Sequence, residues 1–480
     1  MALLEGLEVS EVKYENLNLG DRADAEYYSK DNLRIETLLN HLPHIRLSEI
    51  AKLTASAFYP AATHLYESGD MPFLRCVDTV KFPVISHLQN DSFIKIPAQF
   101  AEESKGINFL RKHDICLTKV GTPCYASIIY EHERIAMSRT VMGLSEIQNI
   151  DPFYLTIFLR SKYGFQQLTR EREQTIQYQL TLDRVGDIRI FTPSTNFQKK
   201  IKSLALESFT FDKNAQEIQS TSEQPLLSAL GLKDWQPPNP LTYEASSKTA
   251  FTSNRLDAEF FNSKYDAALD ALKAAGAKSI RPLGALLKSL TNGHTPLKHN
   301  LSEGEVPFIC SEHVQDFEVN LESSKRILAE HHKTELKRTQ LKNNDILLTI
   351  KGRVGNAAIV EGLDGAANIN QDVALLRLNQ ELPHWWIISF INSRFGRLMT
   401  EKYQTGQINP FLSLGTIRTL PIPVFEDKLM EDVGKQMQTL VLKARTARQQ
   451  SKARLERAKR AIEIAIEQDE ATALTYLKES

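Results

Sequence analysis

The chain repeats its own sequence, and an internal repeat constrains the fold more strongly than any other sequence feature. Residues 22–28, RADAEYY, return as residues 255–261, RLDAEFF, at an offset of 233 residues. Four further pairs of segments follow in the same order at offsets of 231 to 235 residues: MPFL with VPFI, DICLT with DILLT, SKYG with SRFG, and LTL with LSL. Because both order and spacing are kept, we interpret the chain as a tandem duplication.

Each copy predicts the same series of elements. A short helix is expected at residues 33–42 and again at 265–277. The runs DICLTKV and DILLTIK alternate apolar, β-branched and polar residues, which favours half-buried strands. One helix of about 15 residues is expected in each copy, within residues 151–168 and 383–399, where apolar residues recur at helical spacing.

A long helix is expected after each copy. Apolar and small residues recur at steps of three and four from Phe197 to Ile218 and from Val433 to Ala465. A helix over residues 426–468 would be about 65 Å long at 1.5 Å per residue, and its apolar seam requires a partner helix. We expect the two long helices to pack antiparallel, as a spacer between two globular domains related by a pseudo-twofold axis.

The predicted fold class is therefore α+β, with two duplicated mixed α/β domains separated by two long antiparallel coiled-coil helices. The expected domains are residues 1–195 and 236–425, and the expected spacer regions are residues 196–235 and 426–480. A length of 480 residues accommodates two large domains of this kind.

Charge and cysteine content narrow the function. Lys and Arg number 58 against 59 Asp and Glu, a net charge of −1, so any nucleic-acid contact is local or shared with partner chains. No apolar run is long enough to span a membrane, and the first residues lack the features of a secretory signal. The four cysteines show no zinc-binding spacing, which favours thiols in a reducing compartment, so we expect a cytoplasmic protein.

Three segments of the second copy carry a family resemblance. They are NNDILLTIKGRVGNAAIV, NINQDVALLRL and FINSRFGRLMTEKYQTGQINPFLSLGTIRTLPIPV. They resemble the target-recognition domain of type I restriction–modification specificity subunits, and RLDAEFF resembles an opening motif found in one branch of that family. The first copy departs from the pattern, because KGRVG becomes VGTPC and NINQD becomes AMSRT.

The resemblance implies a non-catalytic subunit that reads double-stranded DNA, one half of a bipartite target with each domain. Two adenine-specific DNA methyltransferase subunits would dock on the helical regions, and a restriction motor–nuclease subunit would join the same complex. No cofactor is expected in this chain, because S-adenosylmethionine would be held by the methyltransferase. A type IIB-like methyltransferase–nuclease assembly and a coiled-coil scaffold that binds only protein are the alternatives.

Three loops in each copy are candidates for DNA contact, because basic and amide side chains can reach phosphates and base edges. The candidate residues are Lys119, Arg139 and Gln177 in the first copy, and Lys351, Arg353, Asn370, Gln371, Gln407 and Asn409 in the second. The alternatives are a glycine turn with solvated charges at 351–355, and local backbone hydrogen bonding by Asn370 and Gln371.

Two charged groups outside these loops have structural alternatives as well. A basic cluster between Lys443 and Arg460 is either a solvated helix face or a surface for an acidic methyltransferase or for phosphates. Arg22, Asp24 and Glu26, with Arg255, Asp257 and Glu259, are expected to form ion pairs where each domain joins the spacer.

Overall fold

The computed structural model describes residues 10–14, 17, 22, 24–57, 63–66, 69–90, 92–122, 124–173, 178–296, 304–379, 381–406 and 408–478. The chain forms two compact units. The first comprises Met1–Gln216 and Thr446–Ser480, and the second comprises Glu217–Arg445. Each unit is described separately below.

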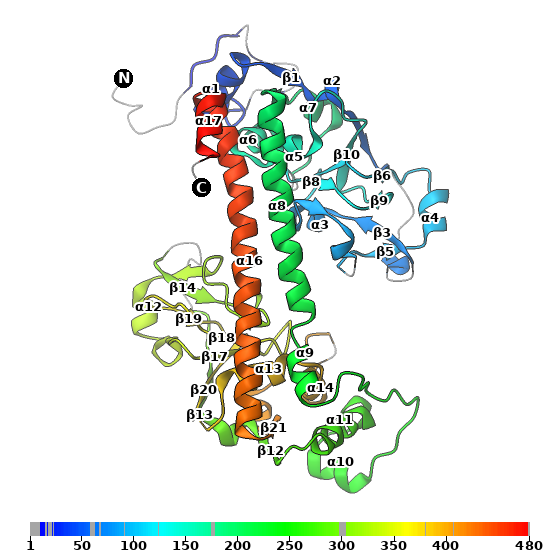
Figure 1. Cartoon of the computed structure of the whole chain (residues 1–480), viewed down its shortest axis with the longest axis vertical. Helices are drawn as coiled ribbons and strands as arrows, with labels where there is room; N and C mark the ends of the chain where they lie inside the picture. Colours follow the sequence, from blue (N-terminus) through cyan, green and yellow to red (C-terminus); the bar gives the residue numbers. More distant parts are fainter. Residues whose placement is uncertain are drawn as a thin grey trace. The chain divides into compact units, whose positions relative to one another are not determined.

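The first unit contains three β-sheets (Figure 1). The five-stranded sheet has the order β2 (Lys52–Ala55), β10 (Val141–Ser145), β7 (Ile115–Thr118), β8 (Ala126–Ile129) and β4 (Val84–Ile85). The four-stranded sheet has the order β5 (Lys95–Ile96), β3 (Met71–Leu74), β9 (Ile135–Met137) and β6 (Phe109–Leu110). The two-stranded sheet pairs β1 (His44–Arg46) with β11 (Arg189–Phe191).

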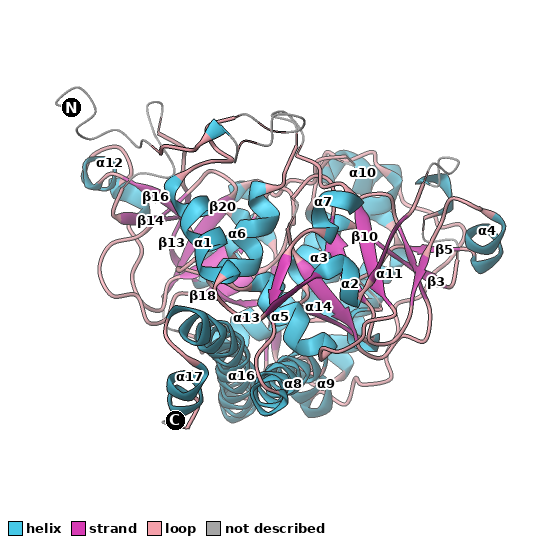
Figure 2. Ribbon diagram, turned by 90° about the horizontal axis from the view of Figure 1, so that it is seen from above, coloured by secondary structure: helices cyan, strands magenta, loops and turns pink. Residues whose placement is uncertain are grey.

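The second unit repeats this strand order, except that its described residues form a second sheet of three strands instead of four. Its five-stranded sheet has the order β13 (Leu287–Asn292), β20 (Val373–Leu378), β17 (Ile346–Thr349), β18 (Ala357–Ile359) and β15 (Phe317–Glu318). A three-stranded sheet has the order β16 (Lys325–Ile327), β14 (Val306–Ile309) and β19 (Asn368–Ile369), and β12 (Ser279–Pro282) pairs with β21 (Pro421–Val424). Figure 2 shows the strands of both units in magenta.

The strand registers also match between the units. Val141 pairs with Thr118 in the first unit, and Val373 pairs with Thr349 in the second. The parallel pairs β3–β9 and β14–β19 match as well, through Phe73 with Ala136 and Phe308 with Asn368. Shared strand order and shared register confirm the tandem duplication.

The helices of the two copies correspond in the same way. The paired helices are α1 (Lys30–Asn40) with α11 (Ser263–Ala274), α5 (Pro152–Arg160) with α13 (His384–Asn392), and α6 (Lys162–Arg170) with α14 (Arg394–Tyr403). The shorter helices are α2 (Leu47–Ile50), α3 (Cys76–Lys81), α4 (Ala98–Glu103), α7 (Leu182–Gly186), α10 (Ser247–Ser253), α12 (Ala329–Lys333) and α15 (Leu414–Thr419). In the described part of the chain, none of the helices is long and apolar enough to cross a bilayer.

The single helix expected within 151–168 and 383–399 is wrong in both copies, because each is two helices. Ser161 and Ser393 separate them with extended backbone, at ψ 168° and 165°. The second helix then begins directly against the end of the first. A Cβ on Gly164 would lie 2.2 Å from the carbonyl oxygen of Phe158, and one on Gly396 would lie 2.1 Å from that of Phe390. Glycine at these positions therefore permits the close turn.

The spacer helices are α8 (Thr195–Ser220), α9 (Gln224–Ala229), α16 (Asp427–Glu467) and α17 (Glu470–Tyr476). With 41 residues, α16 is about 62 Å long at 1.5 Å per residue. Within the first unit, α8 and α16 run antiparallel and side by side, as Figure 1 shows. Ser208 hydrogen-bonds Ser451 at 3.0 Å, and Glu207, one residue earlier, pairs with Arg454, three residues later. The antiparallel packing is confirmed for this unit.

The spacer helices contribute to the core of each unit. In the first unit, Tyr154 of α5 packs in one cluster with Ala458 and Ile462 of α16. In the second, Trp386 of α13 shares a cluster with Leu226 of α9 and Met437 of α16. The compact units therefore divide inside the spacer, at 216/217 and 445/446, whereas the sequence placed boundaries at the ends of the spacer.

Two seam positions in α8 differ from the expected repeat. Steps of four and three from Phe197 place Phe211 and Ile218 in the seam, but Phe209 is buried, and Phe211 and Ile218 are half-buried. The Phe209 ring lies 5.1 Å from that of Tyr130 in an edge-to-face contact. At this point, the contact with Tyr130 determines which residue of α8 is buried, and the 3–4 repeat does not.

Candidate nucleic-acid interface

Three loops meet at one end of the five-stranded sheet in each unit. We call them loop 1 (119–124 and 350–355), loop 2 (138–140 and 370–372) and loop 3 (173–179 and 405–411). Loop 1 connects neighbouring antiparallel strands, β7 with β8 and β17 with β18. Loop 2 leads into β10 and β20, and loop 3 follows α6 and α14. Backbone hydrogen bonds connect the three loops of each unit to one another.

In the second unit, loop 1 lies between the other two loops. The Ile350 amide donates to the carbonyl of Asp372 in loop 2 at 2.9 Å, and the Leu412 amide, just after loop 3, donates to the carbonyl of Ile350 at 2.9 Å. Loop 3 is closed by reciprocal hydrogen bonds between Thr405 and Phe411, at 2.9 and 2.8 Å. The described parts of the three loops that carry the sequence-predicted residues of this copy are thus held together.

The first unit has the same connections. The Lys119 amide donates to the carbonyl of Thr140 at 2.9 Å, and the Leu180 amide donates to the carbonyl of Lys119 at 3.0 Å. Reciprocal hydrogen bonds between Glu173 and Gln179 close loop 3, at 2.9 and 3.1 Å. The backbone of the candidate site is therefore built twice.

The structure supports the alignment of KGRVG with VGTPC in loop 1. Gly121 and Gly352 occupy the same turn position, with φ of 93° and 76°. Val120 bridges to Gln179 as Lys351 bridges to Phe411. Val120 and Thr122 therefore occupy the places of Lys351 and Arg353, and Lys119 stands where the second copy has Ile350.

The side chains of loop 1 differ in charge between the units. Lys351 and Arg353 are both exposed, on either side of Gly352. Among the residues that the structure describes, neither has a side-chain partner. Lys119 is only half-buried, but the exposed position of Arg353 belongs to Thr122 in the first unit. The second unit therefore presents exposed cations at two positions where the first has Val120 and Thr122.

In loop 2, it is the first unit that carries the exposed cation and the second that carries a neutral side chain. Arg139 in the first unit and Gln371 in the second are both exposed and occupy matching positions. The Oε1 atom of Gln371 accepts a hydrogen bond of 2.6 Å from the hydroxyl of Thr295. The amide group of Gln371 keeps its donors for a ligand.

Asn370 is buried, with 6% of its surface exposed. Its Nδ2 donates to the carboxylate of Asp372 at 2.9 Å, and its Oδ1 accepts from the Asp372 amide at 3.1 Å. Ser138 takes the same role in the first unit, where its Oγ accepts from the Thr140 amide at 3.3 Å. This geometry matches the alternative of local backbone bonding, so Asn370 shapes loop 2.

Loop 3 is described at its ends. Gln177 and Gln407, both predicted DNA contacts, lie outside the described residues. Asn409, also a predicted DNA contact, is exposed. Ile408 beside it is 92% exposed, and Tyr178 of the first unit stacks under the Arg172 guanidinium at 4.2 Å. The sequence analysis predicted no role for Ile408 or Tyr178. The signal that could have identified Ile408 is its position as a single apolar residue between Gln407 and Asn409.

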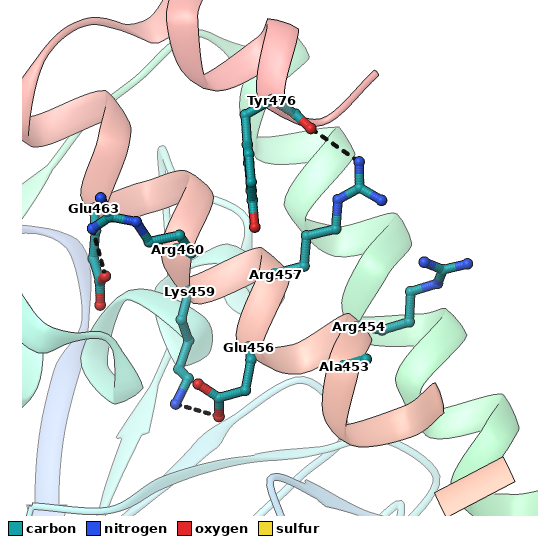
Figure 3. Close-up of a pocket in the computed structure, with 8 residues that line it drawn as sticks. All are labelled: Ala453, Arg454, Glu456, Arg457, Lys459, Arg460, Glu463 and Tyr476. Atoms are coloured by element: carbon teal, nitrogen blue, oxygen red, sulfur yellow. Dashed lines mark hydrogen bonds and ion pairs between the residues drawn. The ribbon is translucent and has the colours of Figure 1, made fainter. Parts of the chain in front are cut away.

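Most of the predicted basic cluster is paired within the chain. In the first unit, a pocket of about 520 Å³ on α16 is lined by Ala453, Arg454, Glu456, Arg457, Lys459, Arg460, Glu463 and Tyr476 (Figure 3). Arg457 donates to the carbonyl of Tyr476 at 3.0 Å, and Lys459 pairs with Glu456 at 2.7 Å.

Three further cations of the cluster have acidic partners. Arg460 pairs with Glu463 and Glu467, both at 3.2 Å. Arg454 lies 3.0 Å from Glu207, without hydrogen-bond geometry at Nε. In the second unit, Arg445 pairs with Glu318 at 2.7 Å and with Glu361 at 3.2 Å. These contacts fit the structural alternative better than an anion-binding surface.

One grouping of metal-type ligands occurs among the described residues, Cys310, Glu312 and His313. The Nδ1 atom of His313 accepts the amide of Cys310 at 2.9 Å, and Glu312 pairs with Lys325 at 3.1 Å. Burial raises the pKa of the Cys310 thiol to about 11. In the first unit, Asp78 accepts the amide of Arg75 in the same way, also at 2.9 Å. The grouping is therefore a turn cap shared by both copies.

No protein-family model matches the chain, and no curated protein matches it. Among solved structures, a type I restriction-modification system S subunit from M. genitalium is similar at 13% identity and a TM-score of 0.43, over 91% of this chain and 96% of that one. The HsdS subunit from Thermoanaerobacter tengcongensis is similar at 14% identity and a TM-score of 0.29, over 89% and 97%. A chain from a structure of the type I R-M system gives 14% and 0.34, over 89% and 99%.

These neighbours include subunits of the family whose motifs the sequence resembles. Their identities and TM-scores are low, so the function proposed below rests on this chain's own loops.

Proposed function

We propose that this chain is the DNA-specificity subunit of a type I restriction–modification complex. The observation that carries the proposal is the duplicated loop site. Its backbone geometry is the same in both units, and its exposed side chains differ. Each set of side chains would read one half of a bipartite target. Catalysis would belong to two adenine-specific methyltransferase subunits, which hold S-adenosylmethionine, and to a restriction motor–nuclease subunit.

A duplicated framework with different side chains suits a ligand that has two different parts. Base edges are distinguished by the donors and acceptors that face them, so different half-sites require different side chains. Two identical loop sets would instead favour two identical half-sites. Val120 and Thr122 against Lys351 and Arg353, and Arg139 against Gln371, are differences of the required kind.

Loop 1 of the second unit supports contact with guanine or phosphate. Arg353 can donate two hydrogen bonds to O6 and N7 of a guanine, and Lys351 can reach phosphate as a point charge. A carboxylate partner would compete with DNA for these side chains, and none of the described residues provides one. In the first unit, loop 2 carries an exposed cation, Arg139, at the position of Gln371.

The net charge of −1 fits a reader that works inside a complex. Neutralising phosphates supplies much of the affinity of DNA-binding proteins, and it requires many cations. Most of the basic residues on α16 already have partners within the chain. We therefore expect the methyltransferase subunits to supply a large share of the phosphate contacts.

The direct test is selection of DNA by the native complex. The full chain is purified from its host with its partners, and a library of randomised duplexes is selected at two salt concentrations. The proposal predicts a motif of two short elements separated by a gap. Selection of no sequence would contradict it and favour the protein scaffold. A partner that carries both methyltransferase and nuclease on one chain would favour the type IIB-like assembly.

A further inference from the structure

We propose that Arg22 and Arg255, the first residues of the duplicated RxDAE motif, are positioning residues for loop 3. Each would hold the end of the helix that precedes this loop and so fix the reading surface of its own unit. The inference rests on the proposed function of the loops. The sequence predicted only that these residues form ion pairs near the spacer.

In the second unit, Arg255 joins its motif to the last residue before loop 3. Its Nε and Nη2 atoms contact the two carboxylate oxygens of Asp257, at 2.5 and 2.6 Å. Nη2 also donates to the carbonyl of Gln404 at 3.3 Å. Gln404 is the C-cap of α14, and Thr405 begins loop 3.

In the first unit, Arg22 makes the same connection. Its Nε and Nη2 atoms contact the Asp24 carboxylate, at 2.5 and 3.0 Å. Nη1 donates to the carbonyls of Arg172 at 2.9 Å and Arg170 at 3.3 Å. Arg172 precedes Glu173, the first residue of loop 3 in this unit, just as Gln404 precedes Thr405. The ion pairs are confirmed, but they lie at the base of loop 3.

An aromatic residue of the motif strengthens the contact in both units. The Tyr27 ring has the Arg22 guanidinium 4.9 Å from its centroid and the Arg170 guanidinium at 4.0 Å. The Phe260 ring has Arg255 at 4.8 Å and Lys402 of α14 at 5.4 Å. The ring therefore attracts the motif arginine and a cation from the last turn of the helix, where positive charge is favoured.

The geometry explains why arginine is needed. The carboxylate engages two nitrogens of the planar guanidinium and so fixes its orientation, which leaves another N–H aimed at the carbonyl. The arginine side chains are 15% and 21% exposed, so water competes weakly for these bonds. Lysine keeps the charge but has no planar fork, and it would lose the fixed direction.

The first test measures the loop itself. Hydrogen–deuterium exchange is followed in the full chain for Arg255→Lys, Arg22→Lys and wild type. Thr405 and Phe411 donate the backbone hydrogen bonds that close loop 3 of the second unit. Arg255→Lys should speed exchange there by roughly tenfold and leave Glu173 and Gln179 unchanged, because opening of loop 3 would become local. Arg22→Lys should do the reverse.

A matched control is Arg281→Lys. Arg281 of β12 also pairs with a carboxylate in the second unit, that of Glu381, and both residues lie outside the three loops. This variant should leave exchange in loop 3 unchanged. Equal exchange in Arg255→Lys and wild type would overturn the proposal, as would equal acceleration of both units by a single substitution.

The second test measures reading by the complex. DNA selection with Arg255→Lys should relax base preference in one half of the motif by about tenfold, and Arg22→Lys should relax it in the other. Uniform loss across both halves would overturn the positioning role. Absence of any two-part motif with the wild-type complex would contradict the proposed function instead, while the exchange experiment would still decide whether these arginines position loop 3.

Discussion

The two units share a backbone and differ in the chemistry that it presents. Both close loop 3 with reciprocal hydrogen bonds and turn loop 1 on a glycine with positive φ. On that common framework, the second unit carries exposed Lys351 and Arg353, and the first carries Val120 and Thr122. The residues that fix the loop backbone are therefore separate from the exposed residues that a ligand could contact. The exposed residues can differ between the units while the backbone stays the same.

The largest expected effect concerns the shared framework. Gly396→Ala should lower the free energy of unfolding by roughly 3 kcal/mol, because its Cβ would meet the backbone of Phe390 and Ile391, which cannot yield. Gly164→Ala should cost a similar amount, since its Cβ would meet Phe158 and Leu159. Urea denaturation measures both. A cost in one unit alone would break the equivalence of the two frameworks.

Gly415→Ala is the control for this pair. Gly415 lies in α15, and a Cβ there would be 3.6 Å from the Ser413 hydroxyl, an ordinary contact. Alanine should be neutral or stabilising by about 0.5–1 kcal/mol, because it favours helix more than glycine does. Destabilisation equal to that of Gly396→Ala would show that the effect does not come from the close turn.

The second effect concerns the side chains on loop 1. Arg353→Ala should weaken discrimination in one half of the DNA target by about 1–3 kcal/mol, the value of a bidentate arginine–guanine contact. Thr122→Ala, at the matching position of the first unit, should have a smaller effect and in the other half. Competition binding of the complex to DNA altered in each half measures both. Failure of Arg353→Ala to assemble with its partners would instead place loop 1 at a protein interface.

The third effect concerns the glutamates that bind the first residues of α6 and α14. Glu223 accepts hydrogen bonds from the Arg394 amide at 3.0 Å and from its guanidinium at 3.0 and 2.6 Å. Glu463 accepts from the Lys162 amide at 3.1 Å, and its ion pair with Arg460 at 3.2 Å is weakened by water because Arg460 is 47% exposed. Glu223→Ala should therefore cost about 1 kcal/mol more than Glu463→Ala. Hydrogen exchange in α14 and α6 checks this, and equal costs would show that the guanidinium contributes nothing.

The smallest effect is a pH dependence common to both units. Hydrogen bonds from Arg255 lower the pKa of Asp257 below its ordinary value of 3.8, and those from Arg22 lower the pKa of Asp24. A lowered folded-state pKa means that the carboxylate stabilises the protein above pH 3.8 and loses this effect as the pH falls through the folded value. The two carboxylates are partly exposed, so the effect is small.

The corresponding measurement compares melting temperatures of wild type and Asp257→Asn. Their difference should be constant above the ordinary value of 3.8 and should shrink below it, as Asp257 becomes protonated. Asp24→Asn should behave alike. A difference that grows on acidification would contradict the direction of the shift.

The sequence predicted the features that depend on order and periodicity. Constant offsets predicted the duplication, alternation predicted strands such as β7 and β17, and the 3–4 repeat predicted α16 within one residue at each end. The loops that carry Lys351 and Gln371 were identified because polar residues follow one predicted strand and precede another.

The rest depends on contacts between distant residues. The breaks at Ser161 and Ser393 lie inside continuous apolar periodicity, which cannot show that two short helices fold against each other. The basic cluster is neutralised by Glu207, Glu318 and Glu361, which are far away in the sequence. Burial of Asn370 depends on its contact with Asp372 in a closed loop. Such contacts depend on the three-dimensional fold and cannot be predicted from order and periodicity in the sequence.

The most direct test of the central claim is a genome-wide map of adenine methylation in the host. The gene is deleted and then complemented with wild type or with Arg353→Ala. We predict that one gapped, two-part motif loses methylation on deletion, returns with wild type, and returns with Arg353→Ala relaxed in one half alone. Survival of every motif after deletion, with the methyltransferase still expressed, would contradict the claim that this chain directs methylation to a bipartite target.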